Sequence, residues 1–282
     1  MSSKAKNIKG VFREVIRQIP WISDLYNHHW GFYLNPNAYQ GVFSSFQDAL
    51  DAIPQHYRST YNLPELHRYP EEMSNLVQTA TRLNPQDYPV LFWLNSILKD
   101  NSTLLDLGGK AGQSFYSYQN YLSYGKELRW IVCDLPAAVE AGQKLAEKLE
   151  SKNISFKTNW SNIDELNILL TCGTLQYLEQ PLAEIIKSLS SRPQHVLVHR
   201  VPCYDGEQYI TLQNLIASIV PYKIQNRQQL IDSITDLGYE LIDSWSNNRT
   251  CSIPFHPERF VKGYYGFYFR DKEKLSHYKK QE

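Results

Sequence analysis

The chain has 282 residues, of which 42% are hydrophobic and 21% are charged, and its 29 Lys and Arg are balanced by 29 Asp and Glu. The lack of a basic excess argues against a dedicated nucleic-acid-binding domain, which needs cations to neutralise phosphates. No apolar run reaches the roughly 18 residues that a membrane-spanning helix needs. Basic side chains interrupt the apolar positions of residues 1–20, unlike a secretory signal, so we expect a cytoplasmic protein.

Residues 1–100 are predicted to form a helical extension. Apolar side chains recur there at helical spacing over residues 8–19, 46–53, 73–80 and 90–98. The first stripe has basic flanks, which are typical of a helix at a membrane surface. Two alternatives stand for it: a weak peripheral membrane contact through residues 1–20, or docking on the protein's own core or a partner.

After residue 100, short apolar runs alternate with helical stretches in the order of βαβ units. The predicted strands are 103–107, 129–133, 154–157, 167–171, 195–200, 239–245 and 263–270, and the clearest helices are 136–149, 181–189 and the stretch between Asn226 and Gly238. The predicted fold class is α/β: a seven-stranded, mostly parallel Rossmann-like sheet with helices on both faces and a final antiparallel pair as one option. The predicted domains are the extension 1–100, a sheet domain 101–271 and a polar tail 272–282.

The four cysteines contain no CxxC pair, so the sequence predicts no zinc or other metal site. Cys133 and Cys172 lie in or beside apolar runs, where a free thiol acts as a small core side chain. Four thiols without a disulfide framework also fit a reducing compartment.

An apolar strand ends in an acid and a glycine-rich turn at LLDLGGKAG, residues 104–112. Ligands of an open parallel sheet bind beyond the carboxyl ends of its strands near the topological switch, and this turn follows such an end. Its glycines permit close approach of the backbone to a ligand. The dinucleotide fingerprint GxGxxG does not fit, because from Gly109 it requires glycine at Ala111 and Ser114. An NAD-linked enzyme therefore stays only as an alternative.

The same turn resembles the first motif of class I S-adenosylmethionine-dependent methyltransferases, an acid followed by x-Gly-x-Gly-x-Gly. Asp106, Gly108 and Gly112 match it, Gly109 lies within it, and Lys110 replaces the middle glycine. A lysine is tolerable there if its φ is negative and its side chain points away from the cofactor. We therefore expect a negative φ at Lys110, with cofactor binding retained.

Two further segments follow in the order expected of these enzymes. The strand WIVC, residues 130–133, ends in Asp134 and Leu135, and an acid at this tip can accept hydrogen bonds from both ribose hydroxyls. Residues 167–178 (NILLTCGTLQYL) resemble the fourth-strand region, where small residues such as Gly173 lie beside the transferred methyl and Tyr177 lies in the helix start that follows. The resemblance implies S-adenosyl-L-methionine as cofactor.

A narrower resemblance covers roughly residues 30–270. The segments YQGVF (39–43), SFQDA (45–49), YPVLFWL (88–94) and VHRVP (198–202) look like a bacterial family of methyltransferases associated with surface-polysaccharide gene clusters. This resemblance implies a glycan or glycan precursor as acceptor.

Other side chains near the predicted strand ends are candidates for acceptor chemistry. His199, backed by Asp205, is the candidate general base, and a hydrogen-bonded structural histidine is the alternative. Arg200 is a candidate ligand for a phosphate or carboxylate, against a structural ion pair, and Lys110 is a second candidate, against a solvated lysine. Trp160 and Tyr177 are candidates to flank adenine or substrate, against simple packing.

These observations predict methyl transfer to a small-molecule or glycan-like acceptor. The alternative function is a non-catalytic protein of the same fold that binds a ligand or partner, which the lysine in the glycine-rich turn favours.

Overall fold

The computed structural model describes residues 31–57, 62–63 and 83–276. The predicted helices at 8–19 and 73–80, and the predicted membrane contact through residues 1–20, lie outside these ranges. Within the described ranges, no helix has the length and apolar character needed to cross a membrane.

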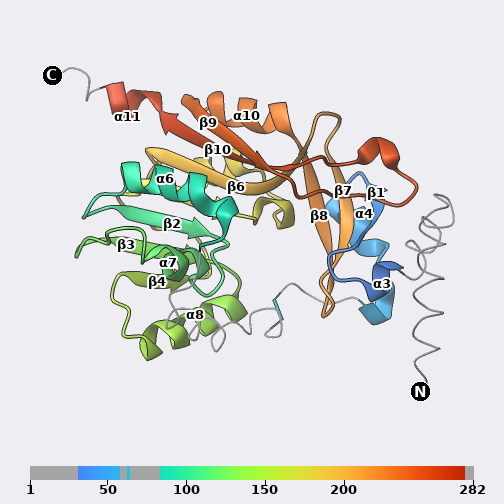
Figure 1. The fold of residues 1–282 in the computed structure, drawn as a ribbon, viewed down its shortest axis with the longest axis horizontal. Coiled ribbons are helices and arrows are strands. Elements are labelled where there is room, and N and C mark those ends of the chain that lie inside the picture. The colour runs from blue at the N-terminus through green and yellow to red at the C-terminus, as the bar shows by residue number, and fades with distance from the viewer. Residues whose placement is uncertain (1–30, 58–61, 64–82, 277–282) are drawn as a thin grey trace.

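The described chain forms one mixed sheet of ten strands with helices around it (Figure 1). The strands are β1 (Tyr39–Phe43), β2 (Thr103–Leu107), β3 (Arg129–Cys133), β4 (Ile154–Lys157), β5 (Ile168–Cys172), β6 (His195–Tyr204), β7 (Tyr209–Asn214), β8 (Ile219–Asn226), β9 (Tyr239–Asn247) and β10 (Tyr264–Asp271). The prediction of seven strands was wrong in number. The seven predicted strands are present, and β1, β7 and β8 add to them.

The strand order places a topological switch between β2 and β5. β2 pairs in parallel with β3 on one side and with β5 on the other, β4 lies beyond β3, and β6 lies beyond β5. β10 is antiparallel to both β6 and β9. This arrangement agrees with the predicted option of an antiparallel final pair. The carboxyl ends of β2 and β5 therefore flank the crevice where such sheets bind ligands.

Alternating side chains give the sheet two apolar faces. Leu104 faces a cluster with residues of α6, α7 and α8, whereas Leu105 faces a cluster with residues of α9 and α10. These helices are α6 (Tyr88–Ile97), α7 (Gln113–Tyr118), α8 (Pro136–Lys148), α9 (Leu182–Ser188) and α10 (Arg227–Thr235). Pro136 at the first turn of α8 and the side-chain cap of Asn226 on Gln229 N show why two of them begin where the sequence predicts.

β1, β7 and β8 form an antiparallel extension, seen to the right of the larger part of the sheet in Figure 1. It joins that part where Cys203 and Tyr204 of β6 pair with the end of β8. α3 (Phe32–Leu34) and α4 (Phe46–Asp51) pack on one of its faces. The helical extension predicted for residues 1–100 thus also contains a strand, β1, which the sequence analysis did not predict. Short 3-10 turns are η2 (Gln55–Tyr57), η4 (Pro85–Asp87), η5 (Leu175–Tyr177) and η6 (Pro257–Arg259).

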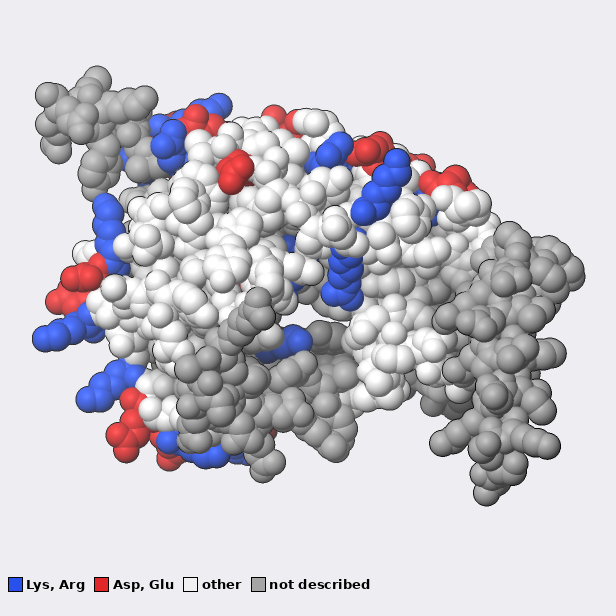
Figure 2. Space-filling model, in the orientation of Figure 1, with Lys and Arg blue, Asp and Glu red and all other residues white. Residues whose placement is uncertain are grey.

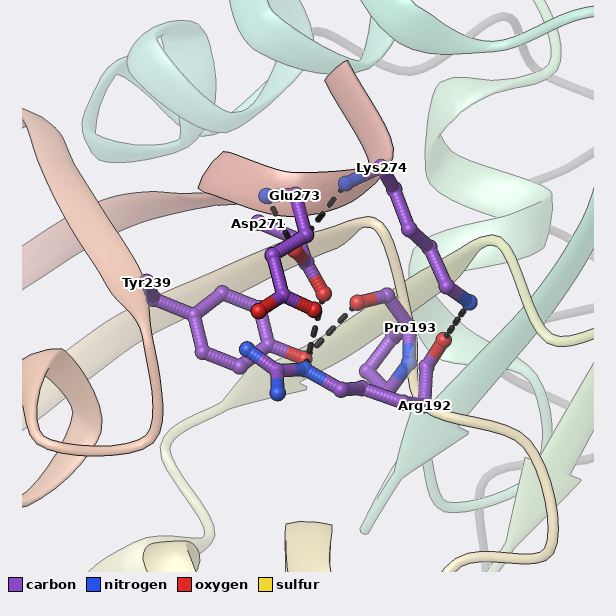
Figure 3. Close-up of polar contacts among 6 residues, drawn as sticks. All are labelled: Arg192, Pro193, Tyr239, Asp271, Glu273 and Lys274. Atoms are coloured by element: carbon purple, nitrogen blue, oxygen red, sulfur yellow. Dashed lines mark hydrogen bonds and ion pairs between the residues drawn. The ribbon is translucent and has the colours of Figure 1, made fainter. Parts of the chain in front are cut away.

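A polar network fixes the end of β10 at the amino-terminal edge of the parallel strands (Figure 3). Arg192 Nε lies 2.7 Å from the buried Asp271 Oδ2, and the guanidinium stacks 4.6 Å from the centre of the Tyr239 ring. Asp271 Oδ1 also accepts the backbone N–H of Glu273 at the start of α11 (Lys272–Ser276). The predicted polar tail thus begins as a helix, at the edge opposite the ligand crevice.

Candidate functional site

The glycine-rich turn lies directly on Asp106 at the end of β2. A Cβ atom on Gly109 would sit 2.5 Å from the Asp106 carboxyl carbon, and one on Gly108 would sit 2.2 Å from the Thr174 side chain. Gly108 and Gly112 have φ of 73° and 87°, a left-handed backbone that glycine adopts without a side-chain clash. The turn therefore packs tightly against the segment that follows β5. A side chain at position 108 or 109 would clash, and position 112 has a backbone that favours glycine.

Asp106 is fully buried beneath this turn. Its Oδ2 accepts the indole N–H of Trp130 at 3.2 Å, whereas its buried Oδ1 has no hydrogen-bond partner among the described residues. Burial, and then the negative charge of Asp134, raises the pKa of the Asp106 carboxyl to about 7. The site thus holds a carboxyl group that titrates near neutral pH.

Asp134 connects the turn to the start of α8. Its Oδ2 accepts the backbone N–H of Lys110 at 2.8 Å, and its Oδ1 accepts the backbone N–H of Leu135 at 2.7 Å. Asn62 Oδ1 accepts the N–H of Ala137 in the first turn of the same helix. Asp134 and Leu135, both predicted site residues, thus lie beside the glycine turn, and the Leu135 side chain is exposed.

Lys110 has a backbone conformation that the sequence analysis did not predict. Its φ is +54°, in the left-handed region that costs a side-chain-bearing residue about 1–2 kcal/mol. The expectation of a negative φ was therefore wrong, because the turn keeps the glycine-type backbone of the motif although a lysine occupies it. Burial, followed by the positive charge of Arg200, lowers the pKa of the Lys110 ammonium.

A cavity of about 340 Å³ opens at this edge of the sheet. The glycine turn, the segment after β5, the middle of β6 and the loops of the antiparallel extension supply its described lining: Pro36, Asn37, Lys110, Gln113, Cys172, Gly173, Gln176, Tyr177, Arg200, Leu215, Ile216 and Arg249. Figure 2 shows a hollow between the two parts of the molecule, with basic side chains at its margin. Four predicted site residues, Lys110, Gly173, Tyr177 and Arg200, therefore share one cavity.

Gly173 and Gln176 form its wall beyond β5. Gly173 has φ of +71° and donates its N–H to the carbonyl of His199, while Gln176 Nε2 donates to the Gly173 carbonyl at 2.8 Å. The buried Oε1 of Gln176 has no partner among the described residues. Tyr177 donates its hydroxyl to Gln213 Oε1 at 2.8 Å and packs edge-on against Tyr222.

His199 lies buried in a hydrogen-bonded chain. Trp245 Nε1 donates to His199 Nδ1 at 3.0 Å, so Nε2 carries the ring hydrogen and donates to Asp87 Oδ1 at 3.1 Å. Burial lowers the pKa of this imidazole, which favours the neutral ring. A general-base role would require one of these two contacts to break.

Asp205 does not lie behind His199 as predicted. Its carboxylate is exposed and pairs with Arg227 at 2.8 Å, because β6 runs on past His199 to Tyr204 and carries Asp205 away. The carboxylate partner of His199 is Asp87, which the sequence analysis missed, since nothing in the sequence links η4 to β6. Trp160 is also outside the cavity lining, and its indole N–H donates to Ser188 Oγ.

The sequence analysis also missed Gln176 and Arg249 as lining residues. Gln176 lies three residues after Gly173 in the segment 167–178, so its place in that segment could have predicted it as a lining residue. Arg249 follows β9 in a loop without any motif, and only the fold brings it to the cavity. Among the described residues, no group of His, Cys, Asp and Glu side chains is arranged to hold a metal ion.

The chain matches no protein-family model and no curated protein sequence. Among solved structures it is similar to an S-adenosylmethionine-dependent methyltransferase from Clostridium acetobutylicum, with 9% identity and a TM-score of 0.48 over 73% of this chain and 98% of that one. It is also similar to 1,6-didemethyltoxoflavin-N1-methyltransferase from Burkholderia thailandensis, with 14% identity and a TM-score of 0.44 over 77% and 93%. A third is magnesium protoporphyrin IX methyltransferase from Synechocystis, with 11% identity and a TM-score of 0.44 over 74% and 98%.

Proposed function

We propose that the protein is an S-adenosylmethionine-dependent methyltransferase acting on a small-molecule or glycan-like acceptor. The observation that carries this proposal is the meeting of three sequence segments at one switch point: the glycine turn after β2, Asp134 after β3 and Gly173 after β5. Hydrogen bonds join them, since Asp134 holds Lys110 N and Thr174 Oγ1 donates to the carbonyl of Gly108. Open α/β sheets bind their cofactors at this place.

The polar groups present suit a cationic cofactor. Asp106 Oδ1 and Gln176 Oε1 are buried acceptors without a partner among the described residues, and an unpaired buried acceptor is costly. S-adenosylmethionine carries an ammonium and a sulfonium, and when bound it supplies an electrophilic methyl group. Asp134 and Leu135 would hold its ribose side, and Asp106, Gly108, Gly109, Gly112, Gly173 and Tyr177 would surround the rest.

The protein's own contribution is to orient an acceptor and to exclude water. The cavity walls come from the glycine turn after β2, the segment after β5, the middle of β6 and the loops of the antiparallel extension. Walls on several sides can orient a bound acceptor, and orientation of this kind lowers a barrier by several kcal/mol. The general-base role of His199 stays a prediction, although Asp205 does not lie behind it. The role of Trp160 beside adenine or substrate, the polysaccharide association and the cytoplasmic location also stay predictions.

A thermal-shift comparison of S-adenosylmethionine, S-adenosylhomocysteine and NAD tests the proposal. Because a ligand specific for the folded state raises apparent stability, we expect the first two to raise the melting temperature and NAD to leave it unchanged. Stabilisation by NAD alone would contradict the proposal.

The non-catalytic alternative has one observation in its favour, the engagement of both ring nitrogens of His199. Incubation of the full chain with methyl-labelled S-adenosylmethionine and a mixture of small molecules and glycans separates the two functions. A labelled product is expected of the enzyme, whereas cofactor binding without any labelled product would favour the alternative.

A further inference from the structure

We propose that the acceptor carries an anionic group, a carboxylate or a phosphate, and that Lys110, Arg200 and Arg249 bind it in the cavity. The identification of the bound anion as part of the methyl acceptor rests on the proposed function. The anion site itself is inferred from the charges and contacts of the cavity. The three cations come from the glycine turn, from β6 and from the loop after β9, so the fold alone brings them together.

The described lining of the cavity contains these three cations and no acidic residue. Among the described residues, the buried Arg200 Nε has no hydrogen-bond partner, and the Arg200 guanidinium interacts with the Cys172 side chain. Neither Arg200 nor Arg249 forms an ion pair with a described carboxylate. Arg249 instead stacks 4.9 Å from the centre of the Tyr264 ring. Guanidinium groups held in this way are available for charge-assisted hydrogen bonds to an anion.

Two nearby carboxylates are engaged in hydrogen bonds, and a third, Asp106, lies outside the cavity lining. Asp87 accepts from His199, Asp134 accepts two backbone N–H groups, and Asp106 lies fully buried beneath the glycine turn. Lys110 and Arg200 are close enough for the charge of Arg200 to lower the pKa of Lys110. Asp134 acts on Lys110 in the opposite direction, but it does not line the cavity. The described cavity lining therefore carries three cations and no acid, while Asp87 and Asp106 act on Arg200 from outside the lining.

The backbone of the cavity is also costly to maintain. Eight described residues other than glycine have a positive φ, and Asn37, Lys110, Arg200 and Ile216 among them line this one cavity. Lys110 at +54° and Arg200 at +58° hold conformations that glycine would adopt at lower cost. Strain of this kind concentrates at functional sites, where a particular side chain is needed in spite of it.

The remaining lining indicates the body of the ligand. Tyr177, Leu215 and Ile216 supply apolar surface, and Ile216 is 78% exposed at the cavity mouth. A volume of about 340 Å³ is at the small end of the range for small-molecule sites. The site thus fits a small molecule with an apolar part beside a carboxylate or phosphate.

Inorganic phosphate is the first probe, with thermal unfolding of the full chain as the readout and chloride at equal ionic strength as the reference. We expect phosphate to stabilise the wild type, and Arg249→Gln to weaken that effect by about tenfold in phosphate concentration, because one charge-assisted hydrogen bond is lost. Because Arg249 is exposed, we expect its variant to fold. The matched control is Arg259→Gln, which removes another arginine that stacks on a tyrosine, Tyr209, but lies outside the cavity.

Saturation with S-adenosylhomocysteine separates an acceptor anion from the cofactor's own carboxylate. If the cations bind the acceptor, phosphate adds its stabilisation to the saturated protein, and Arg249→Gln leaves the affinity for S-adenosylhomocysteine unchanged.

Loss of the phosphate effect on saturation, together with weaker binding of S-adenosylhomocysteine by Arg249→Gln, would overturn the proposal and assign the cations to the cofactor. An equal phosphate effect in Arg249→Gln and the wild type would overturn the site itself. Arg249-dependent phosphate binding without any binding of S-adenosylhomocysteine would support the anion site while the proposed function failed.

Discussion

Lys110 has a left-handed backbone where the related motif has glycine, and the structure offers a direct comparison for its cost. Glu150, an exposed residue just beyond the end of α8, has φ of +52°, close to the +54° of Lys110. The two residues share the backbone penalty, but only Lys110 lines the cavity. A difference in ligand binding between their glycine variants therefore reports the lysine side chain and not the backbone.

We expect Lys110→Gly and Glu150→Gly each to raise the free energy of unfolding by about 0.5–1 kcal/mol. Relief of the left-handed penalty of about 1–2 kcal/mol is partly offset by the greater freedom of glycine in the unfolded chain. Urea titration measures both variants. We further expect Lys110→Gly to change the affinity for S-adenosylhomocysteine little, so a large gain from undetectable wild-type binding would contradict the account and favour the non-catalytic alternative.

Titration of the buried Asp106 makes the free energy of unfolding depend on pH, and the variant Asp106→Asn measures this contribution. Burial raises its pKa from 3.8 in the unfolded chain to about 7, so the folded state binds the extra proton between these values. The contribution of Asp106 to the free energy of unfolding therefore falls by up to about 4 kcal/mol as pH rises from about 4 to about 7, and it is constant above that range. Asp106→Asn should remove this component, measured as the difference from the wild type in urea titrations at several pH values. Parallel pH curves for the two proteins would disprove the assignment.

The strands of the parallel core were predictable because their side chains follow simple patterns. β2, β3 and β4 have the predicted bounds, and β5 differs by one residue, since near-continuous apolar runs mark strands buried on both faces. β7 and β8 were missed because buried polar residues interrupt them, and β8 also contains Pro221. Thr211 and Gln213 are buried only because Gln40 and Tyr177, far away in the sequence, supply their hydrogen bonds.

The same reasoning separates the predictable part of the site from the rest. The glycine turn, Asp134 and Gly173 follow strand ends and carry a motif, so the sequence locates them. Asp87, Trp245 and Arg249 reach the site through elements distant in the chain, and no spacing rule connects them to it.

Lys223 on β8 is a buried amine whose removal should stabilise the protein. The residue is 4% exposed, its Nζ donates to the Glu179 carbonyl at 3.2 Å, and burial lowers its pKa from 10.5 to about 8. We expect Lys223→Met to raise the free energy of unfolding at pH 7 by about 1–2 kcal/mol, since the penalty for the buried charge, up to about 3 kcal/mol, exceeds the lost hydrogen bond of about 1 kcal/mol. Urea titration at pH 7 measures the change.

The pH dependence provides the control for this variant. Because the pKa is lower in the folded state, the wild type should gain stability as pH rises from about 8 to 10.5, whereas Lys223→Met should lack that gain. A variant that is less stable than the wild type at pH 7 would show that the Glu179 contact outweighs the cost of burial.

At the scale of the whole molecule, the antiparallel extension adds a wall to a crevice that stays open to solvent on one side. In Figure 1, β1, β7 and β8 continue the sheet beyond β6. Asn37, Leu215 and Ile216, in the loops of this extension, line the cavity. The hydroxyl of Tyr264 on β10 contacts those of Tyr39 and Tyr222 at 2.9 Å each, which ties the extension to the core. Under the proposed function, the core would supply the cofactor side of the site and the extension a wall of the acceptor side.

Calorimetric titration of S-adenosylhomocysteine into the wild type and Asp134→Asn tests the central claim most directly. Asparagine keeps one acceptor for the backbone of the turn but removes the charge that two ribose hydroxyls would share, so we predict binding by the wild type and binding at least about tenfold weaker in the variant. The exposed Asp232→Ala on α10 is the control and should bind as the wild type does. No heat of binding in the wild type, or equal affinity in Asp134→Asn, would contradict the account.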